Sequence, residues 1–115
     1  MNQEKQRIAI AEACGWRHKE RVFEVGVQIE LGGWYDPDGH FYGEHTSDLP
    51  NYLNSLEAMH EAVETLRHKD GPEWFDFQKH LADICGSTGN CIQATAAQRA
   101  ESFLKTLGLW TGKHD

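Results

Sequence analysis

The chain has 115 residues and a mass of 13.1 kDa, which is the size of a single domain. With 39% hydrophobic and 25% charged residues, its composition is globular and argues against a wholly disordered chain. Acidic residues outnumber basic ones by 18 to 11, so the net charge of −7 argues against non-specific binding to duplex DNA. We expect one domain over residues 1–110 and a flexible polar tail over 111–115.

The N-terminal segment from Met1 to Arg7 is polar and charged, and no long apolar run follows it. This pattern predicts neither a secretory leader nor a membrane span, and we expect a cytoplasmic protein. The three cysteines, Cys14, Cys85 and Cys91, are an odd number and are expected to be free thiols. Their spacing matches no common zinc pattern, so no cofactor or resident metal ion is predicted.

The first third of the chain predicts a helix and then β structure. Residues 3–14 lack Gly and Pro and are rich in Ala, Glu and Gln, which favours a helix that ends at Gly15. In residues 22–31, apolar and polar side chains alternate, which predicts one strand with a bulge at Gly26.

An aromatic hairpin is predicted next, over residues 34–42, because Pro37, Asp38 and Gly39 supply turn chemistry between two aromatic pairs. Residues 43–53 are expected to form a loop.

Three helices are predicted in the second half. The first covers residues 55–68 and is expected to be capped by Asn54, with Glu57 completing a capping box. The second begins at Pro72 and stops at Gly86.

The last helix opens with a capping box of Thr95 and Gln98 and ends at Gly108. Before it, residues 91–94 are expected to form a short strand, and after it Leu109–Trp110 are expected to fold back on the core. The resulting order of elements predicts an α+β fold, with a small mixed or antiparallel sheet flanked by helices.

Three segments carry a family resemblance: residues 10–16, residues 49–62 and residues 94–110. They are similar to the bacteriophage ABA-sandwich domain family, and residues 17–43 depart from its pattern. The resemblance implies an α-β-α sandwich, a phage source and an accessory factor that acts in the cytoplasm of the bacterial host. It implies no catalytic residues, so any function inferred from this resemblance is an analogy.

Two groups of histidines and acids are candidate sites for acid–base or metal chemistry. His60, Glu64 and His68 share one face of the predicted 55–68 helix, but the second motif of a di-iron site is missing. His40 and His45 lie in loops among aspartates and glutamates, which equally build turns and solvated surfaces.

Two further groups are candidates for binding. Trp34, Tyr35, Phe41 and Tyr42 form the densest aromatic cluster, and on a hairpin about half of them should point away from the core. Thr95 and Arg99, at the start of the last helix, together with the loop 87–90, are candidates for gripping a phosphate. The alternative is a helix cap and an arginine stem on apolar surface. The binding candidates together are Trp34, Tyr35, His40, Tyr42, His60, Thr95 and Arg99.

Three functions remain open. The leading hypothesis is a non-enzymatic phage protein that binds and inhibits a component of host antiviral defence, its acidic body docking on a basic protein surface. A second is a homo-oligomeric sponge for a nucleotide immune signal, which predicts positive potential near Arg99, Arg67 or Arg17. A third is a small metal-dependent enzyme that uses His40, His45 and His60.

Overall fold

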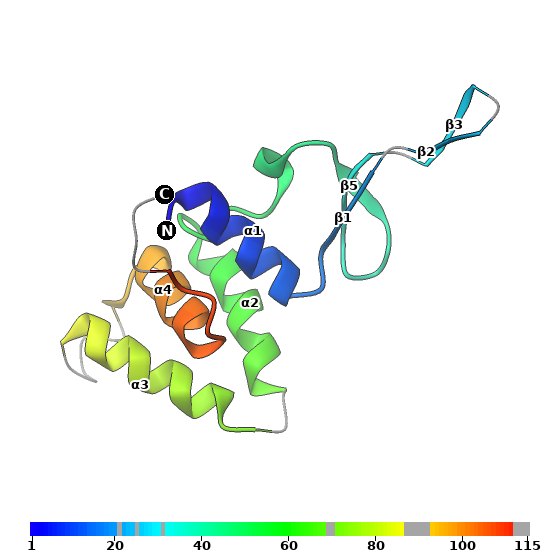
Figure 1. Cartoon of the computed structure of the whole chain (residues 1–115). Helices are drawn as coiled ribbons and strands as arrows, with labels where there is room; N and C mark the ends of the chain where they lie inside the picture. Colours follow the sequence, from blue (N-terminus) through cyan, green and yellow to red (C-terminus); the bar gives the residue numbers. More distant parts are fainter. Residues whose placement is uncertain (21, 25, 31, 69–70, 87–92, 112–115) are drawn as a thin grey trace.

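The computed structural model describes residues 1–111, except for residues 21, 25, 31, 69–70 and 87–92. The described residues form an α+β fold in which helices pack together and a small antiparallel sheet lies beside them (Figure 1). The helices are α1 (Gln3–Ala13), α2 (Leu56–Arg67), α3 (Glu73–Cys85) and α4 (Ala96–Thr106), with a short 3-10 helix, η1 (Thr46–Asp48). The predicted fold class is therefore confirmed, and no helix among the described residues is long and apolar enough to cross a membrane.

Helix α4 is the centre of the packing, because α1, α2 and α3 all contact it. Its apolar face is buried: Ala100, Phe103 and Leu104 have no exposed surface. The facing helices contribute Ile10 from α1 and Leu66 from α2, both likewise fully buried. Burial of these apolar side chains is the main contribution that the amphipathic helices make to the stability of the fold.

The helix ends follow local capping rules, with one correction. Thr95 and Gln98 form the predicted capping box of α4, with N–H···O distances of 3.1 and 2.9 Å. The predicted cap of α2 by Asn54 is wrong, because Ser55 accepts from the backbone N–H of Ala58 at 3.2 Å instead. Two neighbouring residues can both cap a helix, and the capping rule alone does not choose between them.

The strands form one three-stranded antiparallel sheet and one two-stranded ribbon. The sheet has the order β1 (Arg17–Lys19), β4 (Gly33–Tyr35) and β5 (Phe41–Gly43), and the ribbon pairs β2 (Val22–Glu24) with β3 (Val27–Glu30). The predicted single strand over residues 22–31 is therefore wrong, because the chain reverses at Gly26, whose φ is +77°. A left-handed backbone at glycine is a turn signal, and an alternating pattern continues across such a turn unbroken.

The two pairings belong to one long antiparallel hairpin. The pairs Arg17–Tyr35 and Lys19–Gly33 share their register with Val22–Glu30, and the register shifts by one residue after that last pair. Figure 1 shows this hairpin leaving the helices at β1 and projecting outward as β2 and β3. The projection explains a radius of gyration of 16.1 Å, against about 13 Å for a compact chain of this length.

The predicted hairpin over residues 34–42 is confirmed, with β4 and β5 joined by a turn in which Gly39 has a φ of +90°. The sheet meets the helices through Trp34, which is 3% exposed and joins the hydrophobic core. The helices contact one another directly, so the sheet flanks the helical group and does not lie between two helical layers (Figure 1).

The ends of the described chain are fixed to each other. The amino group of Met1 donates to the backbone carbonyl of Thr111 at 3.1 Å. Gly108, with a φ of +72°, ends α4 as predicted and turns the chain back, so that Trp110 packs partly buried on the core while Leu109 is 41% exposed. Residues 91–92 of the expected short strand and residues 112–115 of the expected tail lie outside the described residues.

Candidate functional site

One face of the three-stranded sheet is open to solvent and carries aromatic and basic side chains. Tyr35 and Phe41 lie opposite each other on β4 and β5, and their rings meet edge to face with centroids 5.6 Å apart. Lys19 of β1 places its Nζ 4.6 Å from the centre of the Tyr35 ring, and Arg17 is the direct cross-strand partner of Tyr35. We call these four residues the open face.

The opposite face of the sheet is turned toward the core. His18 and Trp34 are cross-strand partners, and their rings meet edge to face with centroids 5.1 Å apart. The indole nitrogen of Trp34 is buried without a hydrogen-bond partner in the structure. Trp34 was predicted as a binding residue, and the structure instead buries it in the hydrophobic core that the helices share.

The first two residues of β5 are exposed, and the third, Gly43, is buried. Phe41 is 37% exposed and Tyr42 is 56% exposed, although both are large and apolar. Tyr42 is held in place by Trp16, whose ring it meets edge to face at a centroid distance of 4.9 Å. Because these side chains are fixed by ring contacts, a partner that covers them would lose little side-chain entropy in ordering them.

A crevice of about 220 Å³ lies between the end of α1 and α2. Trp16, Tyr52 and Glu61 line it, together with the half-buried thiol of Cys14. Burial, with smaller contributions from Cys14 and Glu61, raises the pKa of Tyr52 well above its ordinary value. Tyr52 therefore stays neutral over the physiological range.

The turn between β4 and β5 brings together His40, Asp36 and Asp38. Their ligand atoms all lie within 4.8 Å of one another, the one such group among the described residues. A carboxylate oxygen of Asp36 already accepts from the backbone N–H groups of Asp38 and His40, at 3.0 and 2.9 Å. These hydrogen bonds stabilise the turn, which is the structural role that the sequence analysis gave as the alternative to metal or acid–base chemistry.

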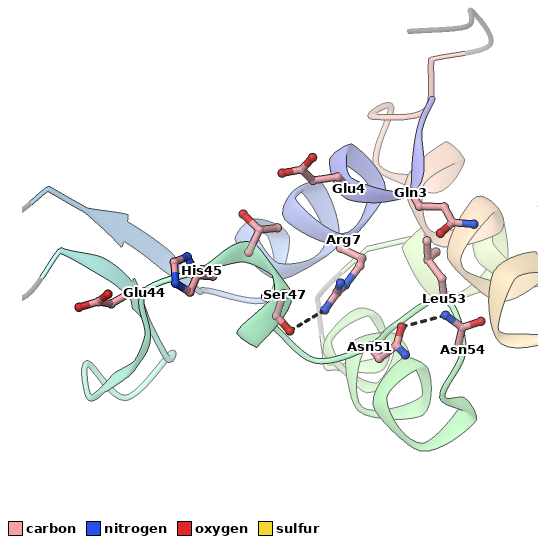
Figure 2. A pocket seen from close by; sticks show the side chains of 10 residues that line it. Gln3, Glu4, Arg7, Glu44, His45, Ser47, Asn51, Leu53 and Asn54 are labelled. Atoms are coloured by element: carbon pink, nitrogen blue, oxygen red, sulfur yellow. Dashed lines mark hydrogen bonds between the residues drawn. The ribbon is translucent and has the colours of Figure 1, made fainter.

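His45 lies apart from His40, at the start of η1, where its backbone N–H donates to Asp48 at 3.0 Å. It borders a polar hollow of about 840 Å³ between α1 and the loop that follows β5 (Figure 2). Figure 2 shows Arg7 reaching from α1 across this hollow, and its Nη2 donates to the carbonyls of Leu49 and Ser47 at 2.7 and 3.4 Å. Arg7 is thus a clamp on the loop.

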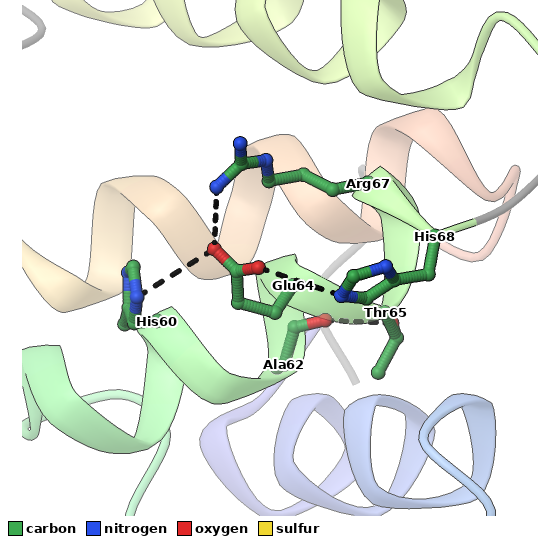
Figure 3. Close-up of polar contacts among 6 residues, drawn as sticks. All are labelled: His60, Ala62, Glu64, Thr65, Arg67 and His68. Atoms are coloured by element: carbon green, nitrogen blue, oxygen red, sulfur yellow. Dashed lines mark hydrogen bonds and ion pairs between the residues drawn. The ribbon is translucent and has the colours of Figure 1, made fainter.

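His60 lies on α2, where Glu64 is the centre of an exposed ion-pair group (Figure 3). Glu64 lies 3.0 Å from Arg67, 3.6 Å from His60 and 3.8 Å from His68. The predicted common face of His60, Glu64 and His68 is confirmed. Exposed pairs of this kind contribute roughly 0–1 kcal/mol to stability, so the group is a solvated surface of modest energy.

Thr95 and Arg99 lie at the start of α4. Thr95 is engaged in the capping box, and the Nε of Arg99 donates to the carbonyl of Ala94 at 3.2 Å. The loop 87–90, which completed the expected phosphate site, lies outside the described residues.

The structure therefore separates the predicted site residues into three places: the sheet, α2 and the start of α4 (Figure 1). Sequence reasoning missed Trp16, which supports Tyr42, and it placed Arg17 only within a possible nucleotide site. No alternation of polar and apolar residues follows Gly15, so the sequence carried no strand signal for either residue, and their place depends on the register of β1. Comparison with protein-family models, curated proteins and solved structures finds no match for the chain.

Proposed function

We propose that this protein is a non-enzymatic binding protein of a bacteriophage that docks on a host protein through its sheet and inhibits a component of antiviral defence. The observation that carries the binding role is the exposure of Phe41 and Tyr42 on neighbouring positions of one strand. Single exposed apolar residues are ordinary, whereas a rigid group of aromatic and basic side chains is typical of protein interfaces.

The chemistry of the open face supports a protein as the ligand. Tyr35 and Phe41 offer flat apolar area, and Lys19 and Arg17 border it with positive charge in a chain whose net charge is −7. Aromatic residues and arginine are the types most enriched at the energetic centres of interfaces. The phage source and the defence target are supported by the resemblance of residues 10–16, 49–62 and 94–110 alone.

The test replaces the exposed aromatics of β5. We expect the double variant Phe41→Ser and Tyr42→Ser to keep its helical circular-dichroism spectrum and to lose the host protein that the wild type retains from bacterial lysate. The matched control is Phe75→Ser on α3, since Phe75 is 70% exposed and distant from the sheet. Equal retention by the wild type and the double variant, or no retained protein at all, would refute the proposal.

The inhibitory role has its own readout. We expect wild-type protein expressed in a defence-positive bacterium to raise the plating efficiency of a sensitive phage, and the β5 double variant to leave it unchanged. The Phe75→Ser control should act as the wild type does. An unchanged plating efficiency with a retained partner would leave binding intact and remove inhibition.

A further inference from the structure

We propose that the free edge of β1 takes an extended acidic segment of the partner, which adds to the sheet as a fourth strand. In the described part of the chain, β1 and β5 are the two edges of the sheet. The edge at β5 is contacted by η1, which follows it directly, whereas Arg17, His18 and Lys19 of β1 are all exposed. An exposed edge offers unpaired backbone N–H and C=O groups, which is the requirement for strand addition.

The charge of the edge selects the incoming strand. Arg17 and Lys19 lie two residues apart and therefore on the same side of the strand, the side of the open face. His18 occupies the alternate position, on the side of its cross-strand partner Trp34. An added strand with Asp or Glu at every second residue would place its carboxylates beside Arg17 and Lys19, where opposite charges on neighbouring strands attract.

The same charges disfavour a second copy of this chain as the occupant. If two β1 strands paired antiparallel about His18, Arg17 of each copy would face Lys19 of the other. Like charges that lie directly opposite on neighbouring strands are destabilising. Basic side chains on an edge strand are a common device against self-association, and they leave the edge available to a segment of opposite charge.

The open face continues the surface that the added strand would cover. Lys19 is held against Tyr35, and Tyr35 against Phe41, so the basic edge and the exposed aromatic residue form one row across the three strands. A partner segment on β1 would therefore position the rest of the partner over Phe41. This inference deepens the proposed function, because it names the part of the partner that is recognised.

The experiment titrates the whole chain with a short synthetic peptide that has glutamate at every second position between threonine and valine. We expect saturable changes in the amide resonances of residues 17–19, slower hydrogen exchange of the amides at the outer edge of β1, and weaker binding at higher ionic strength. Reversal of both charges, Arg17→Glu with Lys19→Glu, should weaken binding at least about tenfold, because two attractive pairs become repulsive.

Two controls keep the test decisive. Lys79→Glu reverses the charge of an exposed residue on α3, and this variant should bind the peptide as the wild type does. The double-reversed variant should gain affinity for the matching peptide with lysine in place of glutamate, which shows that it is folded and that charge decides the choice. Binding that ignores these reversals, resonance changes elsewhere than β1, or a dimer of the free chain that dissociates on reversal would overturn the inference.

Failure of this inference is separable from failure of the proposed function. The peptide titration does not require the host protein, and the lysate experiment does not require the charge of β1. Loss of peptide binding with intact, aromatic-dependent capture would remove only the added strand. Peptide binding to β1 without aromatic-dependent capture would remove only the docking role of Phe41 and Tyr42.

Discussion

The hydroxyl of Ser102 donates a 2.7 Å hydrogen bond to the backbone carbonyl of Phe77, and this bond joins the middle of α4 to the middle of α3. Ser102 has no exposed surface, and it is the one fully buried polar side chain in the described part of the chain. These two helices make the most extensive contact between any two elements of the described chain. The small side chain of serine allows α3 and α4 to pack closely, and the bond to Phe77 satisfies the buried hydroxyl.

We expect Ser102→Ala to lower the free energy of unfolding by about 1 kcal/mol, because a buried hydrogen bond is lost while little volume changes. Urea denaturation followed by circular dichroism measures this. Thr106→Ala is the matched control, since Thr106 donates to the carbonyl of Ser102 at 2.8 Å within the same helix. A larger loss from the control than from Ser102→Ala would show that the bond between helices is not the stronger contribution.

Gly33→Ala tests the close approach of two strands. Gly33 has a φ of +142°, and a Cβ added there would collide with the backbone carbonyl of Gly43 and with Glu44. We expect a loss of roughly 1–3 kcal/mol of unfolding free energy, seen as a lower denaturation midpoint. Gly39→Ala separates the two causes, because Gly39 has a φ of +90° with open space around it. Equal losses in both variants would mean that backbone conformation alone sets the cost.

Arg7→Ala tests the clamp between α1 and the loop before α2. Without the bonds to the carbonyls of Ser47 and Leu49, we expect faster hydrogen exchange at the amides of Asp48 and Leu49, which close the turn of η1. Glu12→Ala, on the exposed side of the same helix, should leave those amides as they are. Unchanged exchange in the Arg7 variant would show that the loop holds its own conformation.

Ionisation of Tyr52 is expected to lower the stability of the folded protein in the alkaline pH range. Burial raises the pKa of its hydroxyl in the folded state, so above about pH 10 the unfolded chain releases this proton while the folded chain keeps it. Stability therefore falls as pH rises past the pKa of an unfolded tyrosine, by about 1.4 kcal/mol per pH unit from this group. Tyr52→Phe should flatten that part of the profile. Parallel profiles for the variant and the wild type between pH 9 and 11 would contradict it.

The helix ends were predictable from the sequence, because each is marked by a few neighbouring residues. Gly15, Gly86 and Gly108 each have a positive φ and lie at the predicted ends of α1, α3 and α4, because a left-handed residue after a helix is a property of a few neighbouring residues. The capping box of Thr95 and Gln98 is equally local. These rules depend on atoms within one turn of chain.

The arrangement of the sheet was not predictable from the same signals. The alternation over residues 22–31 is the same for one strand as for two strands joined at Gly26, so the pattern concealed a reversal. The pairing of Arg17 with Tyr35 depends on where that reversal falls. The candidate residues Tyr35 and Tyr42 were therefore identified by type, whereas their basic neighbours on β1 required the register.

Because the pairs Arg17–Tyr35 and Val22–Glu30 share one register, the length of the projecting ribbon of β2 and β3 can change without altering the pairing of β1 with β4. Removing or adding residues in matched numbers on both sides of the tip leaves His18 opposite Trp34 and keeps that indole inside the protein. A variant of this chain with a longer or shorter ribbon should therefore keep its helical core unchanged.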